Sequence, residues 1–125
     1  MPRPVIDKDV KRLVFTCIPT VPHMEALILL RELPNQMWSA DDIAARLYIK
    51  AEAAMALLRD LSAAGFLAVA EEDPPLFRYL PISEKHRLAI DRLALVHATD
   101  LAGITNLIHD SMRRAVFRIR AAFKN

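Results

Sequence analysis

Apolar residues recur every three or four positions along most of this chain, which is the spacing of amphipathic helices. Proline, glycine and serine residues interrupt this spacing and mark where individual helices begin and end. The pattern predicts a mostly α protein. The expected helices cover residues 5–18, 21–33, 40–47, 51–64, 84–109 and 112–123.

Residues 66–80 follow a different pattern, in which two short apolar runs flank an acidic, proline-containing turn. Such runs are typical of β-strands, so we expect a small β-hairpin with its tip at Glu71–Pro75. Because two strands alone are only marginally stable, the hairpin should lie against the helices. The side chains expected to turn inward are Phe66 or Leu67 and Phe77 or Tyr79.

Local signals define the helix boundaries in the middle of the chain. Ser39 precedes the helix at 40–47, and Asp42 follows three positions later, which is the spacing of a capping box. The short stretch 48–50 suits a tight turn between two helices. Gly65 stands where a left-handed C-terminal cap is needed. The predicted order is therefore helix, short capped helix, tight turn, longer helix and hairpin.

This order resembles a winged helix-turn-helix domain of MarR-like type over about residues 22–82. The motif that carries the resemblance is L-x-x-L-x-x-x-G-[FL]-[LI], here Leu58, Leu61, Gly65, Phe66 and Leu67. The full chain also resembles uncharacterised bacterial winged-helix proteins with an [LM]-E-x-L-x-L-L first helix and a Trp-Ser or Trp-Thr helix start. Those motifs are matched by Met24 to Leu30 and by Trp38–Ser39.

The resemblance implies a winged helix with helical extensions at both ends. The N-terminal extension would cover residues 1–20, the winged-helix domain 21–82, and a C-terminal dimerisation extension 83–125. In winged-helix regulators the third helix, here 51–64, enters the DNA major groove and the hairpin touches the flanking backbone. The resemblance therefore implies a protein of transcription-regulator type.

The C-terminal segment points to self-association. On one continuous helix over 84–109, the apolar residues occupy two sides, and a helix with two apolar sides must bury both. A second copy of the chain would cover the second side, so we expect a homodimer. Gly103 lowers helix propensity by about 1 kcal/mol, which a close helix–helix approach would explain. One side holds Ile90, Leu93, Leu101, Ile104 and Ile108, and the other side holds Leu88 and Leu95. The candidate dimer contacts are Leu88, Leu95 and Gly103.

The distribution of charge argues against strong DNA reading by the predicted third helix. The formal net charge is +2, but residues 21–80 hold five basic and nine acidic side chains. Phosphate neutralisation dominates nucleic-acid affinity, so we expect weak, sequence-tolerant DNA binding carried mainly by the basic last helix. The candidate contacts to nucleic acid or another partner are Lys50, Glu52, Met55, Arg59, Arg78, Arg113, Arg114, Arg118, Arg120 and Lys124.

A protein-interaction role is the alternative. A helix face of alanine, methionine and glutamate beside an acidic wing suits a basic or apolar protein partner. The basic face of 112–123 would equally suit an acidic partner, a membrane surface or plain solvation. Two functions therefore stay open: a regulator with weak DNA binding, and an adaptor that does not read DNA.

The sequence does not contain the patterns that catalysis or metal binding needs. The four histidines form no i, i+4 pair, and no cysteine or carboxylate stands at metal-ligand spacing beside them. We expect no enzyme activity, no cofactor and no metal. Cys17 is the single cysteine and is expected to be buried among apolar residues. With no apolar run near about 18 residues and no signal-peptide layout, a cytoplasmic protein without a membrane span is expected.

Overall fold

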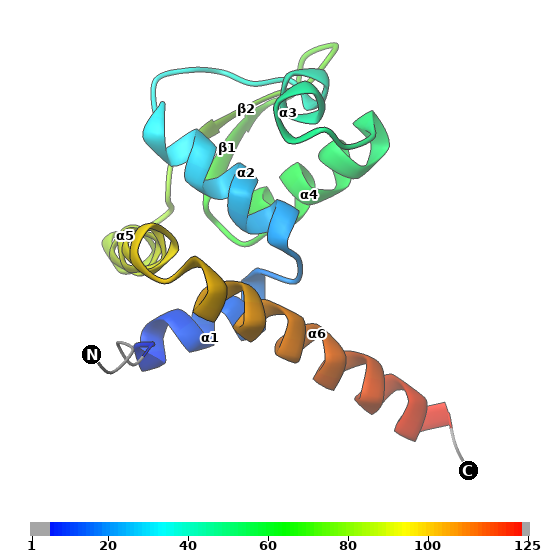
Figure 1. Ribbon diagram of the computed structural model, residues 1–125. Helices are drawn as coiled ribbons and strands as arrows, with labels where there is room; N and C mark the ends of the chain where they lie inside the picture. The colour runs from blue at the N-terminus through cyan, green and yellow to red at the C-terminus, as the bar shows by residue number, and fades with distance from the viewer. Residues whose placement is uncertain (1–5, 124–125) are drawn as a thin grey trace. The chain divides into compact units, whose positions relative to one another are not determined.

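The computed structural model describes residues 6–123, with side chains described as far as Arg114. The chain divides into two compact units. The central unit is Pro22–Leu88, and the terminal unit combines Met1–Val21 with Ala89–Asn125. The elements, labelled in Figure 1, are α1 (Lys8–Cys17), α2 (Val21–Glu32), α3 (Ala40–Leu47), α4 (Ala51–Ala63), β1 (Leu67–Ala70), β2 (Leu76–Tyr79), α5 (Glu84–Thr99) and α6 (Leu101–Phe123).

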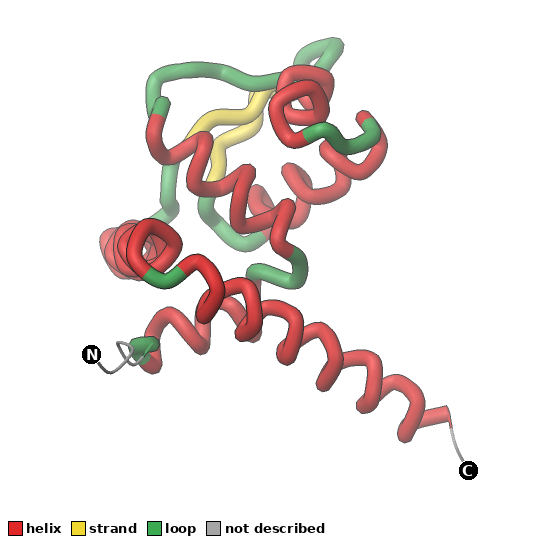
Figure 2. The backbone as a smooth tube through the Cα atoms, viewed as in Figure 1, coloured by secondary structure: helices red, strands yellow, loops and turns green. Residues whose placement is uncertain are grey.

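The central unit consists of three helices, an antiparallel hairpin and the start of α5, which confirms the predicted fold class (Figure 2). In the hairpin, Leu67 pairs with Tyr79 and Val69 pairs with Phe77. Phe77 also exchanges two backbone hydrogen bonds of 2.8 Å with Trp38, in the linker before α3. Strand β2 therefore has a backbone partner on each side.

The aromatic side chains of this region form the centre of the core. Phe66, Phe77 and Trp38 are each at most 2% exposed. Leu67, which follows Phe66 in the sequence, is also buried. This confirms the prediction that both strands turn apolar side chains inward. The inner faces of the helices add further buried residues, namely Met24, Leu27, Leu30, Ile43, Ala54, Leu57, Leu58 and Leu61.

The predicted caps of α3 and α4 are present. The Ser39 hydroxyl accepts the Asp42 N–H at 3.1 Å, and the Asp42 carboxylate accepts the Ser39 N–H at 3.0 Å. Tyr48 ends α3 in the left-handed region with φ 56°, which makes the turn into α4 tight. Gly65 follows α4 with φ +87°, and a Cβ there would lie only 2.8 Å from Cγ2 of Ile82. Glycine is thus required at 65 for conformation and for space.

In the terminal unit, α1 lies against α6 (Figure 1). The Arg92 guanidinium of α5 lies 2.5 Å from an Asp9 oxygen and 3.5 Å from an Asp7 oxygen at the start of α1. Cys17 is half-buried, so it is less enclosed than predicted. The buried side chains of this unit are Val10, Leu13, Val14, Ile18, Ile90, Leu93, Ile104 and Ile108.

The predicted helix over 84–109 is wrong in one respect, because the helix breaks at Asp100. The Asp100 carboxylate accepts the Gly103 N–H at 3.1 Å and the Asp100 carbonyl accepts the Ile104 N–H, so Asp100 starts a new helix. A Cβ at Gly103 would collide with this carboxylate, which gives the glycine a local explanation. The break also leaves Leu101 53% exposed instead of on the buried side.

The predicted break near Ser111 is also wrong, because α6 runs without interruption from Leu101 to Phe123. Serine reads as a cap in the sequence, but the chain uses Asp100 for that purpose and tolerates Ser111 within a helix. Among residues 6–123, no single helix is long and apolar enough to cross a membrane. Helices α1 and α2 reach that length and composition only when counted together.

Candidate nucleic-acid interface

The outer surface of α4 is the face that a DNA-reading helix would present. Lys50 is the N-cap residue of α4, with extended backbone and an exposed side chain, and its side chain does not cap the helix. Glu52 is exposed in the first turn, where a carboxylate stabilises the helix dipole. Met55 is half-buried and Arg59 is exposed one turn further on. These side chains are therefore accessible to different degrees, with one acid near the N-terminal end of α4, and their contact with a partner stays a prediction.

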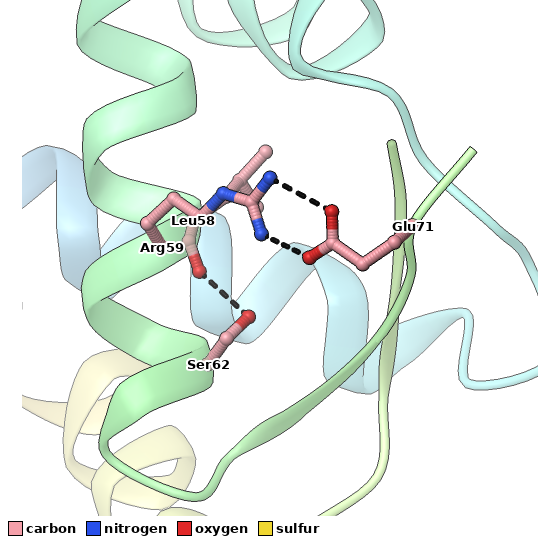
Figure 3. Close-up of polar contacts among 4 residues, drawn as sticks. All are labelled: Leu58, Arg59, Ser62 and Glu71. Carbon is pink, nitrogen blue, oxygen red and sulfur yellow. Dashed lines mark hydrogen bonds and ion pairs between the residues drawn. The ribbon is translucent and has the colours of Figure 1, made fainter. Parts of the chain in front are cut away.

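Arg59 is held by the hairpin (Figure 3). Its two terminal nitrogens lie 2.5 and 3.2 Å from the two carboxylate oxygens of Glu71, the first residue after β1. The guanidinium carbon also lies 5.5 Å from the centre of the Phe77 ring on β2. Nearby, the Ser62 hydroxyl donates to the Leu58 carbonyl at 2.9 Å, so this hydroxyl is engaged within α4 (Figure 3).

The Arg59–Glu71 pair is ionised and neutral as a whole. The hydrogen bonds between the two side chains lower the pKa of the Glu71 carboxyl and raise the pKa of Arg59, because they favour the charged form of each group. Both side chains remain partly open to solvent, at 43% and 62% exposure. The positive charge of Arg59 is therefore already balanced by a carboxylate of the same chain.

The rest of the wing is mostly acidic. Glu72 and Asp73 are exposed at its tip. Arg78 lies on β2 opposite Ala68 and is half-buried. The tip of the wing is therefore a negatively charged surface, which would repel an anion such as a phosphate at low salt.

Two further polar contacts in the central unit are not indicated by the sequence pattern. The Arg46 guanidinium of α3 lies 5.5 Å from the centre of the Trp38 ring, and Nε2 of the buried His23 lies 2.8 Å from an Asp60 oxygen on α4. Each contact joins residues from different parts of the fold, so the spacing of residues in the sequence does not predict it. They link Arg46 of α3 to the linker before it, and Asp60 of α4 to α2.

The basic candidates near the C-terminus lie on α6. Arg113 and Arg114 are exposed, and the guanidinium carbon of Arg114 lies 5.7 Å from the centre of the Phe15 ring on α1. Arg118 and Arg120 are within α6, but their side chains lie outside the described part, and Lys124 lies beyond the described residues. In the sequence, the terminal unit holds ten basic and five acidic side chains, whereas the central unit holds seven and ten.

The two leucines proposed as dimer contacts are exposed, so a second copy of the chain could cover them. Leu88 is 48% exposed and Leu95 is 65% exposed on α5, while Ile90 and Leu93 are fully buried. The helix is thus apolar on a buried side and on an open side, as its sequence predicts. Gly103 lies in the first turn of α6, where Asp100 accounts for it. The dimer itself stays a prediction.

Two features of the described residues bear on metal and ligand binding. Within that part of the chain, no group of three or more histidine, cysteine, aspartate or glutamate side chains could hold a metal ion. A shallow, open groove of about 270 Å³ lies in the terminal unit, with Lys11, Asn106 and Asp110 among its lining residues.

Comparison with known proteins identifies the fold. No family model matches this chain, and no curated protein matches its sequence. The solved structure of the adhesin competence repressor AdcR from Streptococcus pyogenes matches with a TM-score of 0.52 and 17% identity, over 90% of this chain and 84% of that chain.

Two other solved structures give similar matches. The heme sensor protein PefR from Streptococcus agalactiae, in complex with heme, matches with a TM-score of 0.54 and 22% identity, over 95% of this chain and 82% of that chain. RV1404 from Mycobacterium tuberculosis matches with a TM-score of 0.51 and 15% identity, over 91% and 79%. The chain therefore shares the fold of these solved structures, a winged helix-turn-helix with helical extensions at both ends.

Proposed function

We propose that this protein is a non-catalytic transcription regulator that contacts DNA as a homodimer. The observation that carries the proposal is the extent of the structural similarity. The match to the repressor AdcR covers 90% of this chain and 84% of that chain, so it includes the helical extensions as well as the winged helix. A protein-interaction role without DNA is the second candidate, and the matches to a repressor and a sensor do not favour it.

The DNA contact that we propose is weak and tolerant of sequence. Arg59 is paired with Glu71, and Glu52 places a negative charge near the N-terminal end of α4, where base contacts are usually made. Lys50 is then the main cation that α4 can offer to a phosphate. The attraction to DNA must therefore come in large part from basic side chains elsewhere, which supply charge without reading bases.

The test is a fluorescence-anisotropy titration of the full chain with duplex DNA at low and high salt, alongside selection from random sequences. We expect micromolar binding without a strong motif, falling steeply as salt rises because counterions are released. Lys50→Ala should weaken binding by about two- to fivefold, which is the worth of one exposed charge contact. Lys85→Ala removes another exposed lysine, on α5, and is the matched control.

Two results would contradict this proposal. The absence of DNA binding at low salt would favour the protein-interaction role. A nanomolar motif lost on Lys50→Ala or Arg59→Ala would make the protein an ordinary sequence-specific reader.

The proposed homodimer has its own test. Sedimentation velocity at micromolar concentration should give about twice the mass of the chain. Leu88→Asp with Leu95→Asp should shift the protein toward the monomer, because a charge buried at an interface without a partner is costly. Leu33→Asp changes a side chain of the central unit with comparable exposure, 42%, and should leave the mass unchanged. A wild-type monomer under these conditions would refute the dimer.

A further inference from the structure

The Arg59–Glu71 contact has the geometry of a recognition contact. Arginine binds a phosphate, or the O6 and N7 atoms of guanine, through two parallel hydrogen bonds from its guanidinium. Here both terminal nitrogens of Arg59 are occupied by the two oxygens of one carboxylate, at 2.5 and 3.2 Å. Glu71 thus takes the position that a nucleic-acid group would need.

The hairpin also limits where the Arg59 side chain can turn. Glu71 holds the end of the side chain, and the Phe77 ring lies 5.5 Å from the guanidinium carbon. Phe77 is fully buried and is fixed on β2 by its backbone bonds to Trp38. The two constraints come from the two sides of the hairpin, Glu71 directly after β1 and Phe77 on β2, so Arg59 is held toward the wing.

We propose that the Glu71 carboxylate competes with a nucleic-acid phosphate for the Arg59 guanidinium. Glu71 thereby sets the affinity of the α4 face for DNA. In this arrangement a DNA phosphate can bind Arg59 only by displacing the Glu71 carboxylate. The contact is therefore autoinhibitory, with a backbone phosphate as the displacing ligand. This inference rests on the proposed function, because it requires that the α4 face meets DNA.

The role assigned to Glu71 differs from general repulsion by an acidic wing. Glu72 and Asp73 are exposed beside it and act on DNA only through their charge, which salt screens over about 10 Å at 0.1 M. Glu71 also withdraws a specific pair of donors from use. Its pKa lies below the usual range because of the bonds to Arg59, so the competitor stays ionised at neutral pH. Release then depends on a competing anion and not on protonation.

The experiment compares two substitutions that remove the same charge from neighbouring positions. Glu71→Gln and Glu72→Gln each make the wing less negative by one, but only the first disrupts the ion pair with Arg59. Binding of the full chain to a generic duplex is measured by anisotropy over a range of salt concentrations. Glu71→Gln should tighten binding by about three- to tenfold, and its log–log salt slope should steepen by about 0.9, the value for one additional phosphate. Glu72→Gln should tighten binding by less than about twofold, since its charge is screened.

The same comparison in an Arg59→Ala background isolates the contact. Without Arg59, the Glu71→Gln gain should fall to the size of the Glu72→Gln gain, because no donors are released. Circular dichroism and thermal unfolding of each variant establish that the chains are folded. Both groups are exposed, so all of these variants should retain the fold.

The outcomes separate this inference from the function on which it rests. Equal gains from Glu71→Gln and Glu72→Gln would overturn the competitor while leaving DNA binding in place. A Glu71→Gln gain that persists without Arg59 would overturn it as well. Binding that appears only in Glu71→Gln would support it in the strongest form. If no variant binds DNA at low salt, the proposed function fails and the competitor fails with it.

Discussion

Replacing Phe77 by alanine is expected to lower the free energy of unfolding by about 3–5 kcal/mol, the usual range for a large aromatic side chain removed from a core. Phe77 is fully buried, its backbone is bonded to Trp38, and it lies opposite Val69 of β1 in the hairpin. Truncation would leave a cavity where the hairpin joins the rest of the central unit. Urea denaturation followed by circular dichroism measures the change.

The control for this prediction is Phe77→Leu, which keeps most of the apolar volume. It should be clearly milder than the alanine variant, because a smaller cavity is left behind. A loss below about 1 kcal/mol for Phe77→Ala would be typical of a surface site and would show that the hairpin contributes little to the core. The burial of Phe77 beside the Trp38 bridge would then contribute little to the free energy of unfolding.

Reversing the charge of Arg113 and Arg114 to glutamate is expected to weaken DNA binding by about 100-fold, because each reversal removes an exposed charge contact worth about two- to fivefold and adds a repulsion of similar size. Both side chains are exposed on α6. They belong to the unit that carries the excess of basic residues, whereas the central unit is acidic in balance. Anisotropy at low salt measures the loss.

A matched double reversal, Lys8→Glu with Lys11→Glu, makes the same change of charge on α1 in the same unit. Sedimentation must show that both double variants keep the wild-type assembly. If the two variants weaken binding equally, the long-range field of the unit attracts DNA and α6 has no special role. Unchanged binding by the Arg113 and Arg114 variant would place the contact on the central unit.

The elements that the sequence predicts correctly are those with local causes. Ser39 and Asp42 form a capping box because their spacing allows it, and Gly65 is needed for a positive φ that few other residues adopt. The change from helical to alternating periodicity after Gly65 is equally local, so the hairpin could be predicted. The choice of inward side chains followed from the same pattern.

The break at Asp100 could not be predicted from periodicity. A helix that stops and restarts within one residue leaves the apolar spacing almost unchanged, so residues 84–109 read as one helix. The signal was present in Asp100 and Gly103, which stand at N-cap and N3 spacing. Ser111 gave a competing signal of the same kind, and only tertiary packing decides between them.

The candidate site depends on contacts between elements, which sequence spacing does not reveal. Helical periodicity places Arg59 on the outer face of α4, but it does not indicate which way the side chain turns. Its partner Glu71 is twelve positions away on the hairpin, and the distance between them depends on how β1 leaves Gly65. The sequence therefore predicts a weak reading helix, and the Arg59–Glu71 pair is a specific contact that supports this prediction.

The bridge between Trp38 and Phe77 bears on how the protein avoids aggregation. Because β2 is paired with β1 on one side and with Trp38 on the other, the unpaired backbone edge of the described hairpin belongs to β1. That edge is only four residues long, and Glu71 and Glu72 follow it directly. Short edges flanked by charge are poor templates for strand addition from another molecule. The carboxylates of the wing are therefore expected to hinder pairing of the hairpin with another copy of the chain.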